Sequence, residues 1–181
     1  MTGKFMTALL VSFIGGAIVA FPYIIWELWR FLKPALYPKE QKSARGIVFF
    51  SSVLFLCGIL FGYFVINPLS VHFLINFDFG INNIEELYPL NSFMGIVAST
   101  TLATGLMFEL PVLIYFLSKA GIVTPEGMRK YRKHSFVGTL LLSAIITPPD
   151  VFSQVLVSIP IVILYEISIF ISKSVNKNSI R

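Results

Sequence analysis

Long uncharged runs separated by short charged stretches are the main pattern along this chain. Three such runs cover residues 5–26, 46–77 and 87–108 and are 22, 32 and 22 residues long, interrupted only by His72. A helix needs about 20 apolar residues to cross the roughly 30 Å hydrocarbon core of a bilayer. Because the apolar residues are continuous and do not alternate with polar ones, the runs predict membrane-spanning helices and exclude a β-barrel.

The last third of the chain has a different pattern, in which two uncharged runs of 15 residues flank Asp150. Thr147 precedes two prolines, Pro148 and Pro149, and a residue before proline is disfavoured in the α region. We therefore expect a tight external turn at Pro148, Pro149 and Asp150 between two spans, the first of them short.

The fold class predicted from these runs is all-α, a polytopic integral membrane protein with a single membrane domain over residues 1–181. Its five transmembrane helices are expected at about 5–32, 46–67, 92–118, 132–147 and 152–172.

Composition supports this class. Charged residues make up 13% of the chain and hydrophobic residues 56%, whereas soluble domains carry about 25% charged residues. The apolar content also excludes a disordered chain. A single cysteine excludes a secreted scaffold held together by disulfides.

The basic residues lie almost entirely on one side of the predicted membrane. Thirteen of the 14 Lys and Arg residues fall within 30–45, 119–133 and the C-terminal tail, and Lys4 is the exception. Since cytoplasmic loops carry an excess of Lys and Arg, this side and the C-terminus are predicted to be cytoplasmic. The predicted cytoplasmic loops are 33–45 and 119–131, and the predicted external loops are 68–91 and 147–151.

Three carboxylates lie within the predicted spans, where a charge costs about 3 kcal/mol or more and is usually retained for a use. Glu27 lies three residues before Arg30, so an ion pair on the helix surface explains it. Glu166 is close enough to the cytoplasmic end of its span to reach polar surroundings, and a structural and a functional explanation both stay open.

Glu109 lies well inside the third span, with no basic residue within eight positions and with Pro111 after it. Small residues, Thr101 and Gly105 among them, share or border its helical face. We expect this face to leave a groove that a single-span subunit fills. The carboxyl group is either a protonated acid bonded within the bundle or a docking or proton-relay site, and we favour the second.

Two further features have packing explanations. Asp150 can cap the last helix, although capping does not explain Gln154 one turn further along. Small residues four positions apart, such as Gly58 and Gly62, allow close helix packing within the chain or between copies.

No enzyme motif is present. His72 and His134 fall on opposite sides of the predicted membrane, and the chain has no HExxH, Gly-x-Ser-x-Gly or P-loop sequence. We predict no catalytic residues, no metal site and no cofactor. The net charge of +5 is accounted for by the cytoplasmic loops, so it does not indicate binding to nucleic acid.

Several short motifs together resemble the TatC family, the receptor subunit of the twin-arginine protein translocase. They are Trp29-Arg30-Phe31, Pro34-Ala35-Leu36-Tyr37 with Glu40, Phe108-Glu109-Leu110-Pro111, and the specific run Thr147-Pro148-Pro149-Asp150-Val151-Phe152-Ser153-Gln154. The chain resembles spans two to six of this six-span family. An N-terminal segment and a first span are therefore expected before Met1, as the external N-terminus also suggests.

The resemblance implies a function in transport, without chemistry on a covalent bond, at the bacterial inner membrane. It implies that Phe31 and Glu40 bind twin-arginine signal peptides of folded cargo. Glu109, with Thr101 and Gly105, would be the intramembrane site where TatA- and TatB-like single-span subunits dock, and Asp150 and Gln154 would form the external-turn pair. The proton-motive force would drive passage, with self-association in a larger complex and membrane lipid as further contacts.

The alternative is a small proton-coupled secondary transporter or channel in which Glu109 titrates. Such proteins commonly have internal repeats and a helix broken at the membrane midplane. The sequence has no evident repeat, and its only expected sharp break is the external turn. These features favour the translocase component.

Overall fold

The structure is a computed structural model that describes residues 2–32, 44–76, 90–147 and 151–179, and every regular element in these ranges is helical. The elements are α1 (Thr2–Leu32), α2 (Ala44–Phe61), the π-helix η3 (Gly62–Ile66), α3 (Asn67–Asn76), α4 (Leu90–Phe108), α5 (Leu110–Lys119), α6 (Pro125–Lys130), α7 (Arg132–Ile146) and α8 (Val151–Ser179). The predicted all-α fold is confirmed.

Four helical stretches are long and apolar enough to cross a membrane: Gly3–Phe31, Gly46–His72, Phe93–Lys119 and Ser153–Asn176. The remaining predicted span is α7, whose 15 residues extend about 22 Å at 1.5 Å per residue, less than the roughly 30 Å hydrocarbon core. It is short, as expected from the sequence. Five complete crossings stay a prediction.

The second span departs from its expected end at residue 67, because α2, η3 and α3 form one continuous helix that reaches Asn76. The π-turn closes where the backbone N–H of Asn67 donates to the carbonyl of Gly62. Pro68 follows directly, lacks an N–H and crowds the preceding turn. A π-bulge is one way for a helix to accommodate such a residue.

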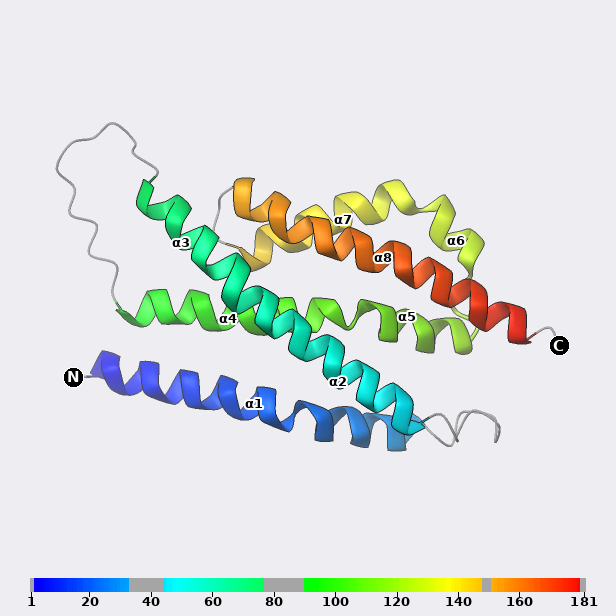
Figure 1. Cartoon of the computed structure of the whole chain (residues 1–181), viewed down its shortest axis with the longest axis horizontal. Coiled ribbons are helices and arrows are strands. Elements are labelled where there is room, and N and C mark those ends of the chain that lie inside the picture. Colours follow the sequence, from blue (N-terminus) through cyan, green and yellow to red (C-terminus); the bar gives the residue numbers. More distant parts are fainter. Residues whose placement is uncertain (1, 33–43, 77–89, 148–150, 180–181) are drawn as a thin grey trace.

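The helices form an elongated bundle in which α1 lies along one edge (Figure 1). The α2–α3 helix crosses α4 obliquely, and α7 and α8 form an antiparallel pair on the other side, with α8 also packed against α5. The aromatic rings of Phe21 and Phe55 stack with centroids 3.5 Å apart and join α1 to α2. Trp29 is buried near the end of α1, and its ring centroid lies 5.5 Å from that of Phe116 on α5.

Many of the large apolar side chains point outward, among them Phe13, Val19 and Ile145. The core instead contains many Ser and Thr side chains, such as Ser51, Thr104 and Ser143. Lipid tails are as apolar as these outward side chains, so helix association in a membrane depends on close packing and hydrogen bonds. The distribution fits a multi-pass membrane protein.

The predicted cytoplasmic loop 119–131 contains one further helix. Gly121 ends α5 with φ of +72°, a conformation that glycine adopts without strain. Thr124 then caps α6, its hydroxyl accepting a hydrogen bond from the N–H of Gly127. Met128 is buried, and its carbonyl accepts a hydrogen bond from the Tyr165 hydroxyl at 2.9 Å. These contacts hold α6 against α8.

Candidate functional site: a carboxyl group at a helix break

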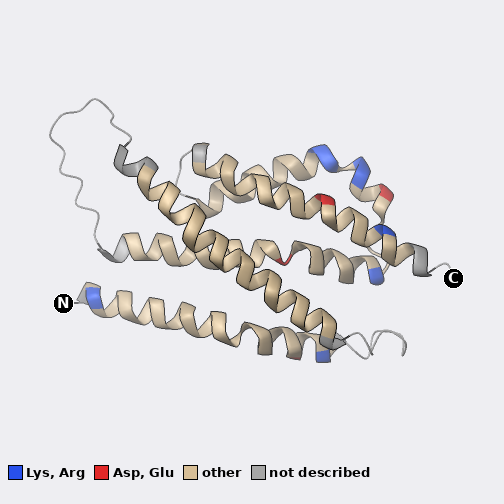
Figure 2. Cartoon of the chain, viewed as in Figure 1, with Lys and Arg blue, Asp and Glu red and all other residues tan. Residues whose placement is uncertain are grey.

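Glu109 lies at a break in the third span, between α4 and α5, where Figure 2 shows a single acidic position along an otherwise uncharged stretch. Its N–H donates to Leu106 O at 3.1 Å, a tighter turn than the α-helix, and its carbonyl accepts from the N–H groups of Val112 and Leu113. Pro111, which cannot donate a hydrogen bond, explains the break. The break is local, because Glu109 keeps φ of −76° and ψ of −5° in the right-handed helical region and Phe93–Lys119 is one helical stretch.

The Glu109 carboxyl group has one protein partner on the neighbouring helix. Its Oε2 accepts a hydrogen bond of 2.7 Å from the hydroxyl of Ser51, a fully buried residue of α2. Its Oε1 is also buried and has no hydrogen-bond partner in the part of the chain that the structure describes. The site therefore holds one buried oxygen without a partner among the described residues, which a further polar group reaches only when the side chain turns.

Thr101 and Gly105 do not line an open groove, because α2 and η3 occupy that face. A Cβ atom added to Gly58 would lie 2.8 Å from the Cα of Gly105, and one added to Gly62 would lie 3.0 Å from the Cα of Thr101. Small residues let the two backbones approach this closely. The expectation of a free groove on this face is wrong, since the small residues admit a helix of the same chain.

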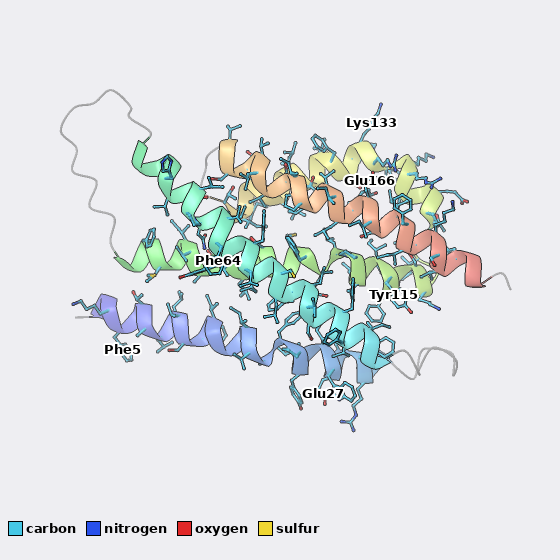
Figure 3. All side chains as sticks on the ribbon, in the orientation of Figure 1. Phe5, Glu27, Phe64, Tyr115, Lys133 and Glu166 are labelled. Atoms are coloured by element: carbon cyan, nitrogen blue, oxygen red, sulfur yellow. The ribbon has the colours of Figure 1, made fainter. Side chains whose placement is uncertain are left out.

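An apolar groove of about 250 Å³ opens one helical turn away from Glu109, between α2, α5 and α8. Its lining residues are Gly46, Ile47, Phe50, Pro111, Val112, Tyr115 and Ile171. Ile47 lies one turn before Ser51 on α2, and Val112 lies one turn after Glu109. Tyr115 lies one turn further along α5 and is labelled in Figure 3. The groove thus adjoins the hydrogen-bonded pair.

A second polar contact inside the spans involves Asn67, which the sequence analysis did not single out. Its buried amide donates to Thr101 Oγ1 at 2.9 Å and to the carbonyl of Val97 at 3.2 Å. Thr101 is therefore a partner of α3 as well as a packing residue. An asparagine followed by Pro68 in an apolar run was the signal that could have identified both this contact and the π-helix.

Short hydroxyl side chains join other helix pairs. Ser70 and Ser153 bond at 2.8 Å between α3 and α8, and Ser118 and Ser172 bond at 2.8 Å between α5 and α8. The amide side chain of Gln154 also joins two helices, since its Nε2 donates to Leu140 O of α7 at 3.0 Å. This bond supplies a packing reason for a polar residue one turn into the last span.

The other predicted binding residues have different outcomes. Phe31 is largely exposed at the end of α1, so its ring is accessible to a ligand. Glu40, Pro148, Pro149 and Asp150 lie outside the described residues. The predicted signal-peptide site and the external turn therefore stay predictions.

The two remaining carboxylates of the spans form ion pairs. Glu27 and Arg30 are 3.6 Å apart on the surface of α1, which confirms the expected i, i+3 pair. Glu166 bonds to Arg132 of α7, a contact across 34 residues that the sequence did not indicate. Figure 3 shows Glu166 on α8 beneath the start of α7. Within the described residues, no group of His, Cys, Asp and Glu could hold a metal ion.

Comparison with known proteins places the chain among translocase proteins. Residues 1–160 match the family "TatC: Sec-independent protein translocase protein (TatC)". A TatC protein from Blattabacterium sp. subsp. Periplaneta americana is 41% identical over 97% of this chain and 65% of its own length. TatCy of Bacillus subtilis is 37% identical over 90% of this chain and 64% of its own. The chain spans about two thirds of the length of such relatives.

The fold agrees with a solved structure. The crystal structure of the twin-arginine translocase receptor TatC in the detergent DDM superposes with a TM-score of 0.77 at 38% sequence identity. The superposition covers 90% of this chain and 72% of that one. A match over most of the chain in both sequence and fold leads to one conclusion: this chain belongs to the TatC family of Sec-independent protein translocase proteins.

Proposed function

We propose that this chain acts in Sec-independent protein transport, binding twin-arginine signal peptides and assembling with single-span TatA- and TatB-like subunits. The proton-motive force then drives folded cargo across the bacterial inner membrane. The observation that carries the proposal is the likeness in sequence and fold to a protein described as the twin-arginine translocase receptor. The relatives' names describe transport and not catalysis.

The proposed topology places the loops 33–45 and 119–131 and the C-terminus in the cytoplasm, where the basic residues gather. Signal-peptide binding is assigned to this face, with the exposed ring of Phe31 and the carboxylate of Glu40 as contacts. A carboxylate can bind a guanidinium group through two parallel hydrogen bonds, which suits an Arg-Arg pair. This assignment follows the match to the family's motif at these two positions.

Docking of a single-span subunit is assigned to the apolar groove beside Glu109. A transmembrane helix placed in this groove contacts Ile47 and Val112, each one helical turn from a member of the Ser51–Glu109 pair. A polar side chain of that helix can bond the buried Oε1, which has no partner in the described chain. Hydrogen bonds between membrane helices are worth about 0.6–2 kcal/mol. Glu109 therefore selects where the partner lies without holding the complex by itself.

Site-specific photo-crosslinking tests this assignment. The full chain carries a photoreactive residue at Ile47 or Tyr115 in the groove, or at Ile145 as an apolar control that is 80% exposed on α7. We expect single-span subunits to crosslink at both groove positions and not at residue 145. Equal crosslinking at all three positions would contradict a specific groove.

Two variants of Glu109 separate docking from proton transfer. Glu109→Ala is expected to lower crosslinking in the groove about 3-fold to 30-fold, the equivalent of one membrane hydrogen bond, with signal-peptide binding retained. Glu109→Gln keeps the shape and the bonding capacity and is expected to keep most of the activity. If both variants abolish export while crosslinks are unchanged, Glu109 acts by titration.

One observation favours the alternative function, a proton-coupled transporter or channel. The third span is broken at Glu109, and broken helices near the midplane are typical of secondary transporters. Purified chain reconstituted in vesicles with a proton gradient distinguishes the two functions. Solute uptake or proton leakage that Glu109→Gln abolishes supports the transporter, whereas tight vesicles together with specific signal-peptide binding support the translocase component.

A further inference from the structure

The end of α6 and the start of α7 carry basic side chains to which the proposed function assigns no role. Arg129 and Lys130 of α6 and Lys133 of α7 are exposed, and none has a carboxylate partner among the described residues. Arg132, in the same stretch, is instead paired with Glu166. Figure 2 shows these basic positions gathered where α6 meets α7, and Figure 3 shows Lys133 pointing away from the bundle.

This basic group is held in place by contacts on its inner side. Met128 is buried and its carbonyl bonds to Tyr165, so the adjacent Arg129 and Lys130 face outward. The Lys130 ammonium lies 6.0 Å from the ring centroid of Tyr131, which is itself more than half exposed. The contact between Met128 and Tyr165 thus fixes α6, and the cations of α6 lie on its exposed side.

An apolar stripe continues from Lys133 along the outer face of α7. Positions four apart on a helix lie above one another, and the positions after Lys133 are Val137, Leu141 and Ile145, all exposed. The distance from residue 133 to residue 145 is about 18 Å at 1.5 Å per residue. One leaflet contributes about 15 Å of hydrocarbon, half of a roughly 30 Å core. The stripe is therefore about as long as one leaflet is thick, and Lys133 lies at its proposed cytoplasmic end.

We infer that Arg129, Lys130 and Lys133, with the stripe Val137, Leu141 and Ile145, form a binding site for an anionic phospholipid. The phosphate group contacts the cations and an acyl chain lies along the stripe. Basic clusters beside a membrane helix attract anionic lipids by charge. The three cations at the start of the stripe favour a ligand with an anionic headgroup over a second apolar protein helix.

Native mass spectrometry of the full chain, released from neutral detergent, measures this binding. The protein is titrated with phosphatidylglycerol and, separately, with zwitterionic phosphatidylcholine of the same acyl chains. We expect tighter binding of phosphatidylglycerol. Each basic residue near an anionic surface contributes up to about fivefold in affinity, so Arg129→Gln/Lys130→Gln/Lys133→Gln is expected to lose between about 10-fold and 125-fold.

A matched variant with three charges removed elsewhere controls for net charge. It carries the substitutions Lys4→Gln, Arg30→Gln and Lys173→Gln, all at exposed positions. We expect it to bind phosphatidylglycerol as the parent does, and so should the charge-conserving variant Arg129→Lys/Lys130→Arg/Lys133→Arg. If the neutral triple variant loses its helical circular dichroism, Lys133→Gln alone should show a fivefold loss.

Three outcomes would overturn the inference. Equal affinity for the two lipids would show that the headgroup charge does not matter. Equal losses of affinity in the two neutral triple variants would show that the positions of the three cations do not matter. If soluble glycerol phosphate displaces the lipid at a concentration equal to that of the lipid, the apolar stripe does not contribute to affinity. The site then binds a free phosphate group. Failure of glycerol phosphate to compete supports a lipid site.

Discussion

The close crossing of α2 and α4 makes Gly58→Ala a stringent test of the fold. The new methyl group would lie 2.8 Å from the Cα of Gly105 and 2.9 Å from the Cβ of Phe108. Both atoms belong to or adjoin the backbone, so no side chain can rotate away. The two helices must separate until the 2.8 Å contact reaches an ordinary 3.4 Å. The Ser51–Glu109 hydrogen bond spans the same pair of helices and is weakened by this separation.

Overpacking of this kind costs about 1–3 kcal/mol. In a chain of 181 residues, 1 kcal/mol lowers Tm by about 2–4 °C, so Gly58→Ala is expected to lower Tm by about 2–12 °C. Thermal unfolding in detergent, followed by circular dichroism at 222 nm in a buffer at fixed detergent concentration, measures the shift.

Two other glycines serve as matched comparisons. Gly138 lies within α7 with no atom within 4 Å of its added Cβ, so Gly138→Ala should leave Tm unchanged or raise it through helix propensity. Gly62→Ala meets the Cα of Thr101 at 3.0 Å and should fall between the two. If Gly58→Ala is as stable as Gly138→Ala, the described crossing of α2 and α4 is incorrect.

Four further predictions address the polar sites and the topology. Ser51→Ala removes the hydroxyl that bonds Glu109 and should lower the free energy of unfolding by about 0.6–2 kcal/mol, which is measured as a lower Tm. Glu109→Gln can still accept this bond and should keep the parent Tm. Asn67→Leu removes two hydrogen bonds to α4 and should lower Tm by at least as much as Ser51→Ala does. Glu40→Lys in a full-length protein should abolish export while the protein stays in the membrane, because like charges then face the signal peptide's arginines; normal export would exclude this role. A single cysteine at Gly127 in a cysteine-free chain should react with an impermeant maleimide only from the cytoplasmic side, and labelling from outside would invert the topology.

The parts of the fold that the sequence predicted well depend on local properties. Uncharged runs located the helices, and Thr147 before two prolines located the end of α7. The Glu27–Arg30 pair was predictable because its two members are three residues apart on one helix. Each of these inferences needs only the length of a run or the spacing within a turn.

The contacts that define the candidate site are not local, and the sequence could not supply them. Ser51 and Glu109 are 58 residues apart, and nothing in either neighbourhood shows which helix lies opposite. For the same reason the sequence predicted an open groove at Gly105, whereas the helix that carries Gly58 packs against this position. Pro111 is a local signal for the end of α4, but it does not show which helix lies opposite Glu109.

The weak attachment of α1 has a mechanical consequence. Among the four long apolar stretches, Gly3–Phe31 has the smallest buried share and Ser153–Asn176 the largest. Extracting α1 from a bilayer into water would still be opposed along its whole length, because its outward apolar side chains, Phe5 and Phe13 among them, leave the lipid. Sideways separation of α1 within the membrane costs much less, since few of its side chains are buried against other helices, and the stacked rings of Phe21 and Phe55 are a main contact that must part.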